Sequence, residues 1–126
     1  MIEYLFMREE IRDIERLNHI LNAINVLIEN KDKHTFEEMA SDTIVFYGFV
    51  KHVEIIGEAV YMLTKEYRDA HPDVEWNAIE RMRHVLVHGY YTTSKNFIWA
   101  TVQQDLPTLR PQIEAYIAEE QAKRGQ

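Results

Sequence analysis

The chain has 126 residues, of which 46% are hydrophobic, a proportion that excludes a disordered chain and predicts one compact domain spanning residues 1–126. It has no cysteine and no apolar run of about 18 residues, so we expect neither disulfides, thiolate-bound zinc nor membrane spans, and a cytoplasmic location. Its 14 Lys and Arg against 21 Asp and Glu give a net charge of −7, which argues against a general nucleic-acid binder because phosphate binding needs clustered cations.

Helical periodicity dominates the N-terminal part of the chain. Apolar residues recur at spacings of three and four over residues 14–28, which predicts a first helix with one buried stripe. Asp13 lies off this stripe, so we expect it to be solvated. The helix is expected to end near residues 30–33, where polar and charged residues follow one another.

The next two helices are marked by their capping residues. The run Thr35-Phe-Glu-Glu38 is typical of a capping box and predicts a short helix. Asp42 or Thr43 is suited to cap the helix after it. Apolar residues at helical spacing extend that helix over about residues 44–68.

Proline and glycine mark helix boundaries in the C-terminal half. Asp73 is placed to cap a helix over residues 74–87, and Gly89 is a suitable stop just past its end. We predict another helix over residues 96–106. Pro107 then kinks the chain or begins a final helix, because proline lacks an amide hydrogen and clashes with the preceding turn.

The predicted fold is all-α, an up-and-down bundle of four to five helices, since no segment shows the alternation typical of a strand. Gly48 and Gly57 fall inside the helix over residues 44–68. Glycine lowers helix stability, so we expect both to permit close contact with a neighbouring helix. Ile20 and Leu27 lie beyond the main stripe of the first helix, which suggests a second buried face in a homodimer with a two-fold axis.

A locally positive strip follows residue 80. No Asp or Glu occurs over residues 81–104, so this strip of an acidic chain is suited to hold an anion. Within it, Arg83 and His88 stand five positions apart and Tyr90 follows. Side chains five apart on an ideal helix point about 140° away from each other. Arg83 and His88 therefore converge only if the helix ends at His88, which Gly89 favours.

This strip resembles the HEPN domains, and within them the HepT-like toxins, whose R-x4-H-x-Y motif is matched by Arg83, His88 and Tyr90. Further matches agree in order and spacing and cover about residues 11–109; they are Glu54-Ile-Ile-Gly-Glu-Ala59, Trp76, Trp99 and Asp105-Leu-Pro-Thr-Leu109. Two positions depart from the family pattern. Lys51 stands where relatives often have arginine, and Glu80 where a small residue is usual.

The resemblance implies a metal-independent endoribonuclease that uses no cofactor and leaves a 2′,3′-cyclic phosphate. His88 is suited to act as acid or base on RNA, and Arg83 to clamp phosphate oxygens. His84 fills the polar position after the arginine, where HepT-like members usually have asparagine. Glu58, as an orienting group, and Lys51, as a phosphate contact, are further supporting candidates. One such histidine per chain for a two-proton reaction predicts a homodimer with both motifs in one cleft.

The resemblance also implies a protein partner. HepT-like toxins pair with a nucleotidyltransferase of the MNT type, the antitoxin, which transfers AMP to the motif tyrosine, here Tyr90. A bulky phosphodiester two residues from His88 would fill the anion site and repel RNA phosphate. We therefore expect AMPylation of Tyr90 to inhibit RNA cleavage.

Alternative interpretations stay open at this point. The bundle could be a non-catalytic subunit that binds a substrate or nucleotide for a nucleotidyltransferase, or a structural dimerisation module. Glu80, His84 and His88 are four apart on one helical face and could bind zinc. Taken singly, Arg83 also suits a surface ion pair, and His88 a histidine stabilised by the dipole at a helix C-terminus.

Overall fold

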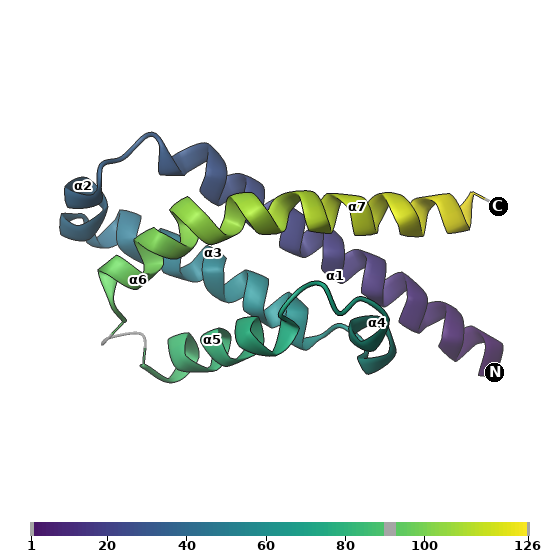
Figure 1. The fold of residues 1–126 in the computed structure, drawn as a ribbon. Helices are drawn as coiled ribbons and strands as arrows, with labels where there is room; N and C mark the ends of the chain where they lie inside the picture. The colour runs from purple at the N-terminus through teal and green to yellow at the C-terminus, as the bar shows by residue number, and fades with distance from the viewer. Residues whose placement is uncertain (1, 90–92, 126) are drawn as a thin grey trace.

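The structure is a computed structural model that describes residues 2–89 and 93–125, and in this part of the chain all regular structure is helical (Figure 1). The helices are α1 (Ile2–Lys31), α2 (Phe36–Ser41), α3 (Thr43–Tyr61), α4 (Lys65–Ala70), α5 (Trp76–Gly89), α6 (Lys95–Ala100) and α7 (Leu106–Arg124), with a π-helical segment over Thr101–Asp105 between the last two. The predicted all-α class is confirmed.

Four long segments run up and down, and α2 and α4 lie at the connections between them (Figure 1). α3 packs against both α1 and α5, and α1 packs against α7. The last long segment consists of α6, the π-helical segment and α7 in one continuous run. No helix in the described ranges has both the length and the apolar character needed to cross a lipid bilayer.

The core lies inside this bundle, and most of its large residues are fully buried. Its largest fully buried side chains are Leu17, Ile20, Ile24, Leu27, Met39, Ile56, Leu86, Ile98 and Ile113. Ile20 and Leu27 are 0% and 1% exposed within a single chain. The suggestion that they form a second face for a homodimer is therefore wrong, because the chain's own core covers them.

The helix predicted over residues 44–68 is divided in two. α3 ends at Tyr61, and Thr64 caps α4 by accepting a hydrogen bond from the amide of Tyr67 (3.2 Å). The carboxylate of Asp13 accepts from both the amide (2.8 Å) and the hydroxyl (2.7 Å) of Thr64. Asp13 is buried rather than solvated as predicted, and it fixes the break by joining α1 to the start of α4.

Other predicted helix starts agree with the structure to different degrees. Thr35 and Glu38 form the predicted capping box, and the Asp42 carboxylate caps α3 by accepting from two amides. α5 begins at Trp76, two residues later than predicted, so Asp73 does not occupy its capping position. Pro107 lies in the first turn of α7. It therefore begins the final helix, which was one of the two roles predicted for it.

The two glycines of α3 differ in their surroundings. A Cβ atom at Gly57 would overlap the Cβ of Arg83, so α3 and α5 approach closely there. A Cβ atom at Gly48 would meet nothing within 4 Å. The prediction of close contact is confirmed for Gly57 and wrong for Gly48. The close approach at Gly57 sets where the motif arginine sits.

Candidate active site on α5

The arginine of the motif is held on the side of α5 that faces α3. Its Nη2 forms an ion pair with Glu58 Oε2 at 2.7 Å, and its guanidinium carbon lies 4.9 Å from the centre of the Tyr61 ring. Gly57 admits the Arg83 side chain at close range, as described above. Arg83 is consequently held against about one turn of α3, from Gly57 to Tyr61.

Two of these contacts follow from the spacing along α3. Tyr61 follows Gly57 by four positions and Glu58 by three, so its side chain is a neighbour of both on the surface of α3. Glu58, predicted as an orienting group for a site residue without a named partner, contacts Arg83. Tyr61 was missed, although its position three residues after Glu58 is the signal that could have identified it. The side chain of Arg83 keeps 25% of its surface exposed, and its guanidinium has further N–H donors beyond the one that Glu58 accepts.

His88 lies on a different side of the same helix. α5 continues through Gly89, so His88 still belongs to the helix and does not turn back toward Arg83 as the early helix end would have allowed. Five positions along a helix separate two side chains by about 140°. The structure gives no contact between Arg83 and His88 within the described part of this chain.

His84 and His88 do come together. Their ring centres are 4.3 Å apart, with the ring planes tilted by 53°. Both residues are exposed, as is Val85 between them. Arg81, three residues before His84, is exposed on the same side. The uncovered face of α5 thus carries two imidazoles and a guanidinium.

The remaining candidate residues are more distant or fall outside the structure's description. Lys51 is exposed and pairs with Glu54 at 3.6 Å. It lies two turns, or about 10 Å, from Glu58 along the axis of α3. Tyr90 lies outside the described residues. The prediction that Tyr90 is the modified residue therefore stays a prediction.

The zinc alternative for α5 fails on geometry. The Glu80 carboxylate pairs with Arg68 at 2.9 Å. Within residues 2–89 and 93–125, no three His, Asp or Glu side chains are placed to hold a metal ion. Glu80, His84 and His88 therefore do not form the metal site that their spacing suggested.

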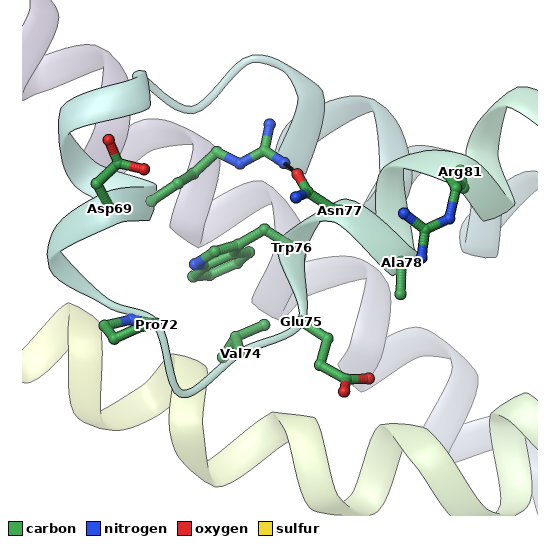
Figure 2. A pocket seen from close by; sticks show the side chains of 9 residues that line it. Asp69, Pro72, Val74, Glu75, Trp76, Asn77, Ala78 and Arg81 are labelled. Atoms are coloured by element: carbon green, nitrogen blue, oxygen red, sulfur yellow. Dashed lines mark hydrogen bonds between the residues drawn. The ribbon is translucent and has the colours of Figure 1, made fainter.

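A hollow of about 460 Å³ opens where α5 begins (Figure 2). Trp76 lines its centre, and Arg81 lies at its edge beside Ala78, as Figure 2 shows. Arg68 and Asn77 also line the hollow. Nη2 of Arg68 donates a hydrogen bond to Oδ1 of Asn77 at 2.7 Å. The hollow extends the exposed face of α5 toward its N-terminal end.

Comparison with known proteins assigns this arrangement to a family. The family model described as "Ribonuclease HepT-like" matches residues 7–116. The chain belongs to the HepT-like ribonuclease family. This confirms the resemblance inferred from the sequence, and the match encloses α5 with Arg83, His84 and His88.

Individual relatives agree with this assignment. A protein of Caldanaerobacter subterraneus subsp. tengcongensis named "Putative RNase" is 38% identical over 104 residues, which are 82% of this chain and 93% of the relative. A "Probable ribonuclease HepT" of Thermococcus cleftensis is 31% identical over 78% of this chain and 89% of its own. A "Putative RNase" of Methanocaldococcus jannaschii is 28% identical over 82% and 95%. No solved structure gives a significant match.

Proposed function

We propose that this HepT-like protein is a metal-independent endoribonuclease and the toxin of a toxin–antitoxin pair that acts on RNA in the cytoplasm. The observation that carries the proposal is the family match over residues 7–116 together with an intact Arg83, His88 and Tyr90 pattern inside it. One relative bears the name "Probable ribonuclease HepT", which supports the same activity for this chain.

The chemistry of the side chains suits RNA cleavage. An RNA 2′-hydroxyl attacks the adjacent phosphorus once a base removes its proton, and histidine titrates in the range where it can take or give that proton. His88 is exposed and free to meet a substrate. Arg83 stays charged and offers further donors to phosphate oxygens, while Glu58 and Tyr61 hold its guanidinium in place.

A homodimer would bring the separated parts of the motif together. Arg83 faces α3 and His88 faces away on the same helix, so a second copy is a direct way to place an arginine opposite a histidine. Val85, beside the histidines, is 62% exposed, and it would supply apolar contact area. Two chains related by a two-fold axis would then share one cleft.

Inhibition would come from a partner enzyme. We assign this role to a nucleotidyltransferase of the MNT type that transfers AMP to Tyr90. The added phosphodiester would stand two residues from His88 and compete with RNA phosphate by charge and by volume. Mass spectrometry of the co-expressed pair tests this: an AMP adduct on Tyr90 that is absent from Tyr90→Phe supports it, and an inhibited pair without the adduct contradicts it.

The second candidate function is a non-catalytic subunit that presents a substrate or nucleotide to a nucleotidyltransferase. The observation in its favour is that Arg83 and His88 do not meet within one chain. Against it, such a subunit has no use for two exposed, adjacent imidazoles on α5.

The products of RNA cleavage distinguish the two functions. Purified protein is incubated with RNA in the presence of EDTA, and the ends of the fragments are analysed. The ribonuclease proposal requires cleavage that persists in EDTA and leaves 2′,3′-cyclic phosphate and 5′-hydroxyl ends. Intact RNA, or cleavage only after a divalent metal is added, would contradict it.

A further inference from the structure

A groove of about 520 Å³ lies between α5 and the continuous run of α6, the π-helical segment and α7. Residues of α3 form its floor and are buried, whereas Phe97 of α6 lines the groove and is 48% exposed. The principal packing partner of α5 is α3, so the groove is the side of α5 that the bundle leaves open toward α7. Its apolar lining includes Val53, Ile56, Ile79, Met82, Phe97 and Leu109.

This groove lies on the other side of α5 from the two histidines. Met82 lines it, and His84 follows two positions later. Two positions turn a helix by about 200°, so the side chains of Met82 and His84 point in nearly opposite directions. A molecule bound in the groove therefore leaves the histidine face of α5 uncovered.

Three exposed acidic residues also line the groove: Asp73, Glu75 and Asp105. Figure 2 shows the side chain of Glu75 extending toward α7. Asp105 directly precedes α7, but its carboxylate makes no capping hydrogen bond there. Within the described ranges, none of the three carboxylates forms an ion pair or accepts a hydrogen bond. The groove thus combines apolar surface with unpaired negative charge.

The charge of the groove restricts what fits it. The carboxylates would repel RNA phosphate. A second copy of this chain fits poorly, because each chain has a net charge of −7 and a two-fold contact would set the same carboxylates against one another. A small apolar molecule would leave the three negative charges without partners. A protein segment that has both apolar and cationic side chains matches both properties of the groove.

The size of the groove fits one face of a helix. Removing a leucine side chain from a protein core leaves a cavity of about 150 Å³, so a groove of about 520 Å³ admits about three such side chains. Residues at positions i, i+3 or i+4, and i+7 of a helix supply three side chains on one face.

We propose that this groove binds an amphipathic helix of another protein, whose apolar face is bordered by lysine or arginine. The bound helix closes the side of the bundle between α5 and α7. Its apolar side chains cover Met82 and Phe97, and its cations pair with Glu75 and Asp105. This goes beyond the proposed function and does not depend on RNA cleavage.

Three labelled peptides that share one apolar face test the proposal. Each has about 18 residues, enough to form a helix, with leucines at helical spacing; the residues that border this face are lysine, glutamine or glutamate. Fluorescence anisotropy with the full chain should find the lysine peptide bound about tenfold or more tightly than the glutamine peptide, and the glutamate peptide bound least. Equal binding of the lysine and glutamine peptides, or no binding of the lysine peptide, would overturn the proposal.

A substitution of Phe97 tests the apolar part of the groove. Phe97→Ser removes an exposed aromatic ring and should weaken binding of the lysine peptide about tenfold or more. The matched control is Ile44→Ser, which changes an apolar residue that is 84% exposed at the start of α3 and should bind like wild type. Circular dichroism establishes that both variants are folded. Equal binding by the two variants would overturn the proposal.

A reversal of charge tests the acidic part. Glu75→Lys combined with Asp105→Lys should reverse the preference, so that the glutamate peptide binds more tightly than the lysine peptide. Glu15→Lys combined with Glu29→Lys changes the net charge equally at exposed positions of α1 and should keep the preference for lysine. If both double variants change the preference alike, binding follows net charge and the groove is not the docking site.

Two further measurements on Phe97→Ser identify a different occupant. The proposal requires wild type and Phe97→Ser to have the same oligomeric state in sedimentation. If the variant dissociates into smaller species, the groove joins copies of this chain and the proposal is wrong. A folded Phe97→Ser protein that cleaves RNA more slowly than wild type would place RNA in the groove and overturn the proposal as well.

Discussion

Gly57 and Arg83 are in close steric contact where α3 meets α5. A methyl group at position 57 would overlap the Cβ and approach the backbone of Arg83, so α5 would have to move. We expect Gly57→Ala to lower the free energy of unfolding by about 1–3 kcal/mol, measured by urea denaturation. Gly48→Ala in the same helix has open space and should be neutral or gain up to about 1 kcal/mol. Equal effects of the two variants would contradict the close approach.

The ion pair between Glu58 and Arg83 gives a second prediction for single residues. Glu58→Gln removes the charge that orients the guanidinium at 2.7 Å and should reduce RNA cleavage. Because the Glu58 side chain is about half exposed, the free energy of unfolding should change by no more than about 1 kcal/mol. Glu54→Gln, which removes the partner of exposed Lys51, is the matched control. Equal cleavage by both variants would show that Glu58 does not orient Arg83.

Where α4 meets α7, the hydroxyl of Tyr67 has an unusual environment. Burial, together with the nearby carboxylates of Glu120 and Glu119, raises the pKa of the Tyr67 hydroxyl above its ordinary value near 10. Its ring stacks on His71 and meets Tyr116 edge-on. The hydroxyl itself has no hydrogen-bond partner within the described residues. The neutral form of Tyr67 is therefore the one that fits this junction.

This feature predicts how stability depends on alkaline pH. Below pH 10 Tyr67 is protonated in both states and its full contribution is present; above pH 10 the unfolded chain releases the proton more readily, so stability falls as pH rises. Tyr67→Phe removes the ionisable hydroxyl and with it this dependence of stability on pH. Urea denaturation at pH 7 should find Tyr67→Phe as stable as wild type or up to about 1 kcal/mol more stable. At pH 10.5–11 the variant's advantage should be larger, and a constant difference would contradict the account.

The helix boundaries show how much of the fold could be predicted from the sequence. Local signals were sufficient where a side chain caps its own helix, as at Thr35 and Asp42. They failed at residues 62–64, because the break there depends on Asp13, which is 51 positions from Thr64. Glu58 was predicted as an orienting group for a site residue, but its pairing with Arg83 became visible only in the structure. The contact of His84 with His88 follows from helical spacing, but it required knowing that α5 continues to Gly89.

For the whole molecule, the arrangement of Arg83 and His88 on different sides of α5 leads to a prediction about assembly. We expect sedimentation at micromolar concentration to find a homodimer. Arg83→Ala and His88→Ala chains, each inactive alone, should recover part of the activity when refolded together, because the cleft that the two chains share then holds one intact arginine and one intact histidine. An active monomer, or a mixture without recovery, would contradict a site built across the interface.

The central claim is that the exposed face of α5 cleaves RNA, and the cleavage rate of His88→Ala tests it most directly. Wild type and His88→Ala are compared on the same RNA in EDTA, with circular dichroism to establish that both are folded. The account predicts that the variant keeps its helical spectrum and loses about 100-fold or more in rate, because His88 is exposed and its ring contacts His84 without a hydrogen bond to the described part of the chain. A folded His88→Ala protein that cleaves as fast as wild type would contradict it.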